Sequence, residues 1–354
     1  MVIDSLAVPF VGAPMAGGPS TPDLVAAVSE AGGLGFLAGG YLAPHQLARQ
    51  IADVWDASSR PFGVNLFVPD RANTFTMPYA AGRVPLTGDL RAQAVSRYRE
   101  CLLPVAERLG VELPEQVPGD SDDWERKLDL VVREKVPVVS FTFGLPGPAV
   151  LAELRRAGIE VVVTVSDVEE AEAALEAGVD ALVVQGPDGG GHRGTLDVAK
   201  EPSTVDVVEL VGLVREGCSV PIVAAGGIST RSRARELLDA GATAVQVGTA
   251  LLRTPEAGTA LAYRRALAAP DLTRTVVTRA FSGRLARALE TDFVRERDHL
   301  APAAYPEVHH LTSPLRRASA AADDHRAMAL WAGTGWRDAA DVPAATVVRQ
   351  IAGD

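Results

Sequence analysis

A ten-residue segment near the middle of the chain, residues 185–194, combines residue types and spacing that could do chemistry. It follows residues 180–184, a short apolar run typical of a fully buried parallel strand. Three consecutive glycines then allow the backbone to turn tightly and to approach a ligand closely. This bare loop carries one imidazole, His192, and one guanidinium, Arg193. The pattern predicts that His192 is a base at the catalytic face of an α/β barrel, and a glycine-rich surface turn is the alternative.

Two glycine turns at the ends of apolar runs could hold a phosphate. Residues 221–225 lead into Gly226 and Gly227, and residues 244–247 lead into Gly248 and Thr249. Glycines expose backbone N–H groups, and the dipole of a following helix favours an anion. Barrels commonly bind phosphate with the loops after their last two strands. The turns therefore predict a phosphate site, and simple helix capping is the alternative.

Two side-chain amides indicate what the phosphate belongs to. Asn65 and Gln185 each end an otherwise apolar run, and an amide both donates and accepts hydrogen bonds. Such groups suit the alternating N–H and C=O edge of a flavin ring, and the turn that contains Met15 could offer backbone to the other edge. The sequence has no P-loop, no zinc-ligand spacing and no lysine at a strand end. ATP, metal and Schiff-base chemistry are therefore not expected.

A strand–helix rhythm predicts the elements that position these residues. Glycine adopts the left-handed conformation that stops a helix, and an Ala-Gly pair ends a helical pattern at Gly32, Gly158, Gly178 and Gly241. Candidate strands lie at 8–13, 34–38, 62–67, 137–142, 159–164, 180–185, 220–225 and 244–248. Eight such units predict a closed (β/α)8 TIM barrel of the α/β class. An open doubly wound sheet is the competing fold, but the turn at 14–18 lacks the G-x-G-x-x-G spacing of a dinucleotide site.

Two stretches interrupt this rhythm. Residues 68–136 contain helical patterns near 89–109 and 121–134, and we expect them to form a helical lid inserted after strand 3. Residues 271–354, with a helix expected from 313 to 332, should form a C-terminal, substrate-side extension over the barrel mouth. The remainder, residues 1–67 and 137–270, is the predicted barrel domain that binds the cofactor.

Composition limits the classes of partner. The 354 residues include 34 basic and 45 acidic side chains, a net charge of −11, and no Lys/Arg block, so nucleic acid is not an expected partner. Cys101 and Cys218 lie far apart, which argues against a thiolate metal site and for a reducing compartment. No basic leader and no apolar run of about 18 residues occurs. We therefore expect a cytoplasmic protein without a membrane or metal partner.

Several short motifs occur in order along most of the chain. They are Met15-Ala16-Gly17-Gly18, Gly63-Val64-Asn65, Gln185-Gly186 followed by Gly190-Gly191-His192-Arg193-Gly194, Ala225-Gly226-Gly227-Ile228, Gln246-Val247-Gly248-Thr249 and Phe281-Ser282-Gly283-Arg284. Together they resemble the nitronate monooxygenases, formerly called 2-nitropropane dioxygenases.

The resemblance implies an FMN-dependent barrel in which His192 faces the flavin and acts as a base or as a substrate anchor. It implies that alkyl nitronates, and nitroalkanes with them, are oxidised by O2 to a carbonyl compound and nitrite. Tyr305 is expected on the substrate side. Many relatives carry His where this chain has Thr142, so Thr142 cannot supply a second base. The expected cofactor-binding residues are Met15, Asn65, Gln185, Gly190, Gly191, Gly226, Gly227, Gln246, Gly248 and Thr249.

Two other functions stay open at this point. An NAD(P)H-dependent FMN reductase of quinones or enoyl thioesters would share the motifs, and a flavin-free barrel for a phosphorylated metabolite would share the glycine turns. The expected partners are a small nitronate or nitroalkane and O2, bound by a monomer or a homodimer. His309 and His310, near Tyr305, are expected at the surface, and a position of one of them at the edge of the pocket is the alternative.

Overall fold

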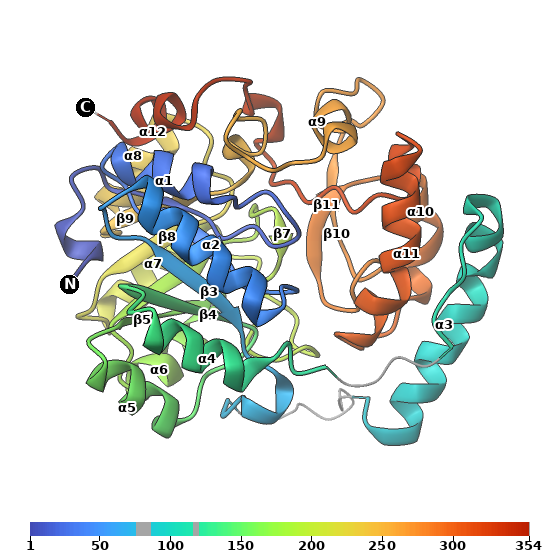
Figure 1. Ribbon diagram of the computed structural model, residues 1–354, viewed down its shortest axis with the longest axis horizontal. Coiled ribbons are helices and arrows are strands. Elements are labelled where there is room, and N and C mark those ends of the chain that lie inside the picture. The colour runs from blue at the N-terminus through green and yellow to red at the C-terminus, as the bar shows by residue number, and fades with distance from the viewer. Residues whose placement is uncertain (76–85, 116–119, 354) are drawn as a thin grey trace.

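The computed structural model describes residues 1–75, 86–115 and 120–353. In these residues the main sheet has eight parallel strands in the order β1-β9-β8-β6-β5-β4-β3-β2 (Figure 1). A parallel bridge between Val11 and Leu34 joins the two edges of the sheet, which confirms the predicted (β/α)8 barrel. The strands are β1 (Phe10–Gly12), β2 (Phe36–Ala38), β3 (Gly63–Phe67), β4 (Val138–Thr142), β5 (Glu160–Val165), β6 (Ala181–Gln185), β8 (Ile222–Ala225) and β9 (Ala244–Val247).

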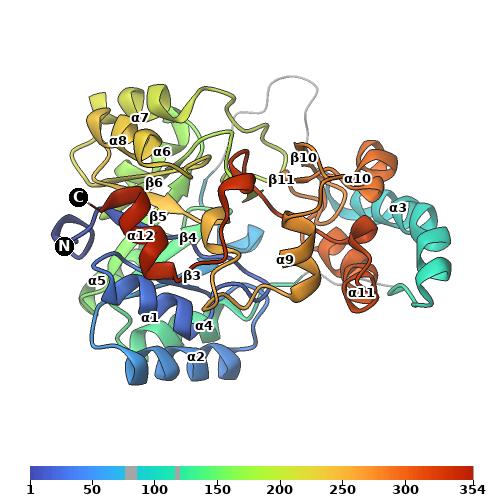
Figure 2. The ribbon, with the colours of Figure 1, turned by 90° about the horizontal axis from the view of Figure 1, so that it is seen from above.

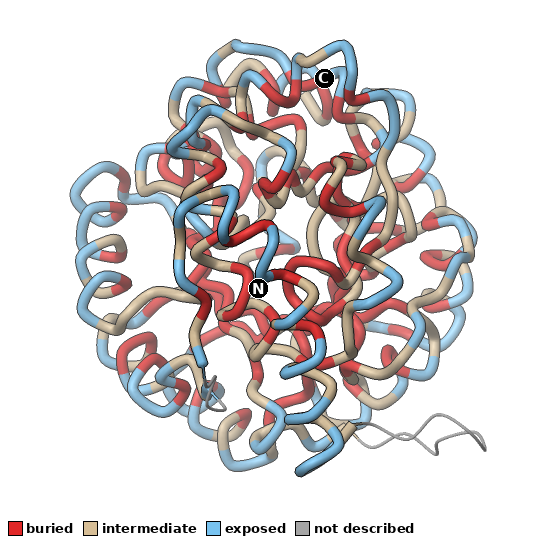
Figure 3. Tube along the Cα trace, turned by 90° about the vertical axis from the view of Figure 1, so that its right-hand side faces the viewer, coloured by how far each residue is buried: buried red, intermediate tan, exposed pale blue. Residues whose placement is uncertain are grey.

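Helices surround this barrel, and their apolar faces pack on the strands in one large core. The predicted helix-ending glycines, Gly32, Gly158, Gly178 and Gly241, all have positive φ, so each turns the chain out of its helix and towards the next strand. Figure 3 shows the result as buried segments inside a ring of more exposed helical turns. The surrounding helices are α1 (Pro22–Glu30), α2 (Pro44–Ala57), α4 (Trp124–Arg133), α5 (Pro148–Arg156), α6 (Val168–Glu176), α7 (Val207–Glu216), α8 (Arg231–Asp239) and α12 (Ala344–Ala352).

A second group of elements lies to one side of the barrel mouth (Figures 1 and 2). Its own apolar core joins Tyr98 and Leu102 to Phe281, Val308 and Leu311. In the described part of the chain, no helix is both long and apolar enough to cross a membrane. The elements are α3 (Gly88–Leu109), α9 (Leu261–Leu267), β10 (Thr275–Thr278), β11 (Ala286–Leu289), α10 (Asp292–Arg297) and α11 (Glu307–Ala321).

The packing refines the predicted lid and extension. Of the two helices in 68–136, α3 packs against α11, whereas α4 packs against β3 and α2 as a helix of the barrel itself. Residues 76–85 and 116–119 of the predicted lid, and residue 354 of the predicted extension, lie outside the described residues. Within the predicted extension, α12 packs against α1 and α8 and so completes the ring of helices. In other respects the three-part division stays a prediction.

A small antiparallel sheet connects the barrel to the second group of elements. Its strand order is β10-β11-β7, where β7 (Gly191–His192) belongs to the glycine-rich loop after β6. His192 pairs with Ala286, and Gly191 pairs with Arg287. The backbone of the proposed catalytic loop is therefore fixed by a strand that lies about 95 residues later in the chain.

Candidate active site

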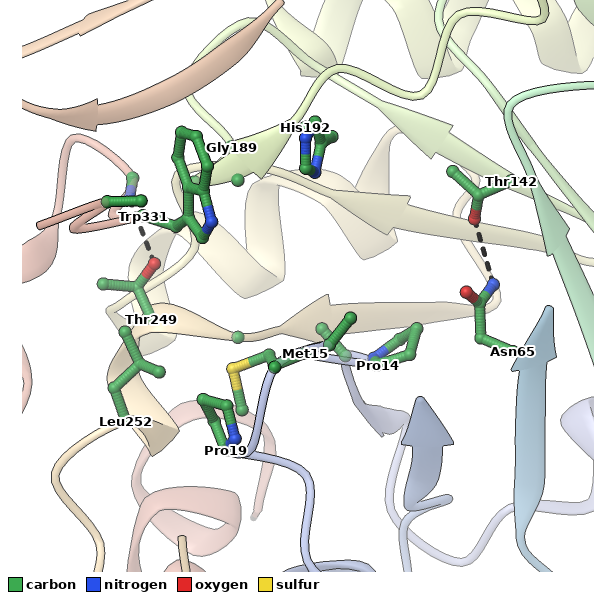
Figure 4. A pocket seen from close by; sticks show the side chains of 18 of the residues that line it. Pro14, Met15, Pro19, Asn65, Thr142, Gly189, His192, Thr249, Leu252 and Trp331 are labelled. Atoms are coloured by element: carbon green, nitrogen blue, oxygen red, sulfur yellow. Dashed lines mark hydrogen bonds between the residues drawn. The ribbon is translucent and has the colours of Figure 1, made fainter. Parts of the chain in front are cut away.

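A cavity of about 570 Å³ opens at the carboxyl ends of the barrel strands. Figure 4 shows its interior enclosed by His192 on one side, Asn65 and Thr142 on another, Thr249 and Trp331 opposite them, and the turn of Pro14 and Met15 below. Cofactor and substrate pockets are typically 300–1,000 Å³. All the residues predicted to bind the cofactor line this cavity, namely Met15, Asn65, Gln185, Gly190, Gly191, Gly226, Gly227, Gln246, Gly248 and Thr249.

His192 is held in place from both its backbone and its ring. The Gln185 side chain donates from Nε2 to the His192 carbonyl at 3.0 Å and accepts from the Gly194 N–H at 2.8 Å. Gln185 thus spans the loop with both ends of its amide. Its contact with a cofactor stays a prediction. On the ring, Nε2 lies 2.9 Å from Ser282 Oγ, and that hydroxyl donates to the Arg284 carbonyl at 3.1 Å. The network therefore assigns the imidazole proton to Nε2 and leaves the Nδ1 lone pair without a partner among the described residues.

The surroundings of His192 combine aromatic rings with nearby guanidinium groups. Its ring lies 5.2 Å from the Trp331 ring and 5.3 Å from the Phe143 ring, measured between centroids. Burial lowers the pKa of His192 to about 3, and the guanidinium groups of Arg284 and Arg316 act in the same direction. The neutral imidazole is therefore the form that the folded protein favours at neutral pH. Of the two roles that the resemblance implied for His192, this state favours the base over a cationic anchor.

The lowered pKa of His192 predicts a flat pH profile. Because His192 stays neutral well below pH 6.5, kcat/KM for a reaction that begins with proton transfer to His192 should not fall between pH 7.5 and 5.5. The unfolded chain does take up this proton near pH 6.5, so the contribution of His192 to stability decreases as the pH falls from about 6.5 towards 3. Steady-state kinetics, with circular dichroism to confirm folding, would check this. A decline with an apparent pKa near 6.5 that is absent from a His192 variant would contradict it.

Asn65 is oriented by its neighbours on β4. Its Nδ2 donates to Ser140 Oγ and to Thr142 Oγ1, each at 2.9 Å (Figure 4). The amide nitrogen is thus engaged, and Oδ1 is left to accept a hydrogen bond from a ligand. Thr142 is therefore a residue that positions Asn65, which agrees with the expectation that it is not a base.

The two glycine turns after β8 and β9 meet at one end of the cavity. Thr249 Oγ1 accepts a hydrogen bond from the Gly333 N–H at 3.0 Å, which fixes the hydroxyl at the cavity wall. A Cβ added to Gly17 or Gly191 would meet no atom within 4 Å, so these two glycines leave free space beside the cavity. Within the described residues the cavity lining has no carboxylate. The lining therefore suits a ligand that carries a phosphate and a large planar ring.

Buried guanidinium groups surround the His192 loop. Arg193 donates to the Gln185 side chain and to the Ser203 carbonyl, and Arg284 donates to the Thr195 and Phe143 carbonyls. Neither forms an ion pair with a described residue, and burial lowers the pKa of both. A protein of net charge −11 thus concentrates positive charge around the His192 loop, which favours anionic ligands there.

Of Tyr305, His309 and His310, the structure places only His309 in the cavity lining. Tyr305 lies behind the wall, where its ring contacts those of Phe143 and His192 and its hydroxyl donates to Tyr41. His309 lines the cavity and stacks on Tyr41 with ring centroids 3.9 Å apart, so the prediction of a surface position is wrong for it. His310, by contrast, is partly exposed and pairs with Asp120.

Known proteins resemble this chain over almost its whole length. A curated protein of Staphylococcus aureus described as a probable nitronate monooxygenase is 34% identical over 98% of this chain and 94% of its own. The crystal structure of a nitroalkane oxidase from Streptomyces ansochromogenes has a TM-score of 0.88 and 44% identity, covering 98% of this chain and 95% of that one. FabK from Thermotoga maritima has a TM-score of 0.72 and 25% identity, covering 99% and 94%.

The closed barrel and its cavity are those of a flavin-dependent α/β-barrel oxidoreductase. The chain belongs to the nitronate monooxygenase family, because the model of that family matches residues 2–354.

Proposed function

We propose that the protein binds FMN and oxidises alkyl nitronates with O2 to a carbonyl compound and nitrite. Neutral nitroalkanes enter the same reaction once a proton has been removed from the carbon next to nitrogen. The observation that carries the proposal is a neutral His192 with a free Nδ1 lone pair, placed in an aromatic cavity whose described lining has no carboxylate. Membership of the family supports it independently.

The chain offers separate groups for the two ends of FMN. Backbone N–H groups of the turns at Gly226, Gly227 and Gly248, with the Thr249 hydroxyl, would hold the phosphate. The free Oδ1 of Asn65 and the backbone near Met15 would meet the edge of the ring. When bound, FMN supplies an electron acceptor that O2 can reoxidise.

His192 acts as the base in this scheme. Nδ1 takes the proton from a neutral nitroalkane, which leaves an imidazolium beside a nitronate. The positive charges that disfavour a lone imidazolium also stabilise the new anion, so the pair is easier to form than either ion alone. A preformed nitronate needs no such step and would require only binding and orientation.

The proposal is tested by mixing the purified holoenzyme anaerobically with an alkyl nitronate and, separately, with NAD(P)H. We expect the nitronate to bleach the flavin absorbance near about 450 nm and NAD(P)H to leave it unchanged. Readmission of O2 should restore the absorbance and yield nitrite. Mass spectrometry of the ligand released by heat should identify FMN.

Two outcomes would replace the proposal. Rapid bleaching by NAD(P)H but not by a nitronate would establish the flavin reductase that shares these motifs. A colourless protein that takes up no flavin after reconstitution would establish a flavin-free barrel.

A further inference from the structure

Helix α11 presents a row of polar side chains to the cavity. His309, Ser313, Arg316 and Arg317 all line it, and their spacing of four, three and one residues places them along one face of the helix. This row belongs to the second group of elements, on the side of the mouth away from the barrel helices (Figure 2).

The guanidinium group of Arg316 uses only part of its hydrogen-bonding capacity within the protein. Its Nη2 donates to the His309 carbonyl at 3.0 Å and to His309 Nδ1 at 3.2 Å, and Nε donates to Thr312 Oγ1 at 3.3 Å. Nη1 has no hydrogen-bonding partner in the part of the chain that the structure describes, and no described carboxylate pairs with the group. Burial accordingly lowers the pKa of Arg316 to about 10, so it stays charged at neutral pH.

The contact with Arg316 fixes the chemistry of His309. A guanidinium can only donate, so His309 Nδ1 must accept, and the single proton of the neutral ring lies on Nε2. Burial and the charge of Arg316 lower the pKa of His309 and keep it neutral. Its ring is held by stacking on Tyr41, whose N–H donates to Asp122, and Asp122 in turn pairs with the buried Lys127. His309 is therefore a hydrogen-bond donor in a fixed position.

Binding of a nitronate in this cavity would require a positively charged side chain to compensate its charge. A nitronate brings one negative charge, and the neutral His192 cannot compensate it. The guanidinium of Arg284 is directed to the carbonyls of Thr195 and Phe143. Arg316 lines the cavity and acts on His192 electrostatically, so it lies within range of the substrate.

We propose that Arg316, together with Nε2–H of His309, binds the two oxygens of the substrate's nitronate group and so selects planar two-oxygen anions. The inference rests on the proposed function for the identity of the substrate. In this scheme the two functions of the site are separate. His192 accepts the proton, and Arg316 and His309 bind the negatively charged nitronate group. The wider chemical class includes short carboxylates, which have the same shape and charge but cannot be oxidised in this way.

The test measures binding without turnover. The holoenzymes of wild type, Arg316→Gln and Arg317→Gln are titrated with propionate, and perturbation of the flavin spectrum gives the Kd. Arg316→Gln should weaken propionate binding by between about tenfold and a hundredfold, the effect of losing a charge-assisted hydrogen bond. Arg317 also lines the cavity, but it is solvent-exposed and its Nη1 donates to Ser313 Oγ at 3.0 Å. Because solvent screens its charge, Arg317→Gln should change the Kd by less than about threefold.

Two further variants extend the test. Arg316→Lys keeps the charge without the planar fork, so its Kd should lie between those of wild type and Arg316→Gln, and it replaces Arg316→Gln if the latter does not fold. His309→Phe keeps the stacking on Tyr41 and removes Nε2–H, so it should weaken propionate binding as well. In kinetics, Arg316→Gln should raise KM for a nitronate more than for the matching neutral nitroalkane.

The outcomes that overturn this inference differ from those that overturn the proposed function. Equal losses of propionate affinity in Arg316→Gln and Arg317→Gln would show that the effect comes from the overall positive charge near the cavity and not from a specific contact with Arg316. Loss of FMN from Arg316→Gln would assign the residue to the cofactor instead. If nitronates prove not to be substrates but propionate binding still depends on Arg316, the proposed function fails and the anion subsite stands.

Discussion

Replacing His192 with asparagine is expected to lower kcat/KM for neutral nitroalkanes by about 10² or more, the usual effect of a positioned base. Asparagine keeps a polar group of similar reach but cannot take up the proton that Nδ1 is free to accept. Activity on preformed nitronates should fall much less, because no proton has to be removed. Steady-state kinetics on a nitroalkane and on its own nitronate give the two losses side by side.

His309→Asn is the matched control, since it makes the same change at a second histidine of the same cavity. It should raise KM for the nitronate without selectively impairing the neutral nitroalkane. FMN content should stay near wild type in both variants, because the proposed phosphate site lies in other loops. If His192→Asn retained full activity on both substrates, the glycine-rich loop would be only a structural turn. Equal losses on the two substrates, mainly in KM, would instead make His192 an anchor.

The second large effect is expected at the phosphate turns, where Thr249→Asp should abolish stable FMN binding. A carboxylate there faces a phosphate of about two negative charges, and one pair of like charges about 4 Å apart costs about 4 kcal/mol in partly buried surroundings. That energy corresponds to an affinity loss of about 10³-fold. Equilibrium dialysis of the reconstituted apoprotein against FMN measures it.

The variant Thr249→Asn is the uncharged control for Thr249→Asp, and it separates the effect of the added charge from the effect of the changed side-chain shape. Asparagine has the size of aspartate, and its oxygen can still accept from the Gly333 N–H, so FMN affinity should fall by less than about tenfold. Gly227 is less suitable for this purpose, because its φ is +72° and an added Cβ would lie 2.6 Å from the Asp188 Cβ. Similar FMN affinities for the Asp and Asn variants would remove Thr249 from the phosphate site.

The barrel was predictable because its signals are local. Apolar runs identify the eight barrel strands, and the Ala-Gly pairs identify four of the helix ends, without reference to the rest of the chain. The ends of parallel strands meet at one mouth, so residues that end such runs, Asn65 and Gln185 among them, converge without further information.

What the sequence did not predict depends on docking between distant segments. The assignment of α4 to a lid failed to separate it from α3, although its buried face, with Trp124 and Leu130, packs in the barrel core. Helix α11 begins at Glu307 and ends at Ala321, earlier than the expected 313–332, because Val308 and Leu311 pack with the second core.

The cavity residues that the sequence did not predict also depend on how distant segments pack together. Whether His309 and Arg316 face a ligand or the solvent is decided by where α11 packs, although their spacing of seven residues, which places them on one helical face, is a signal. Tyr41 could have been found, since it follows Gly39-Gly40 at the end of an apolar run, the pattern that identified Gly226 and Gly227.

The pairing of β7 with β11 also sets an order of events during synthesis. A chain is made from its N-terminus, so all eight barrel strands leave the ribosome before Ala286 and Arg287, the residues that pair with His192 and Gly191. Until then the His192 backbone can have its hydrogen bond from Gln185 but not the strand pairing that completes its register. In a nascent or truncated chain the loops proposed to bind the cofactor can thus be complete before β11 fixes the proposed base, so we expect activity to depend on the last quarter of the polypeptide.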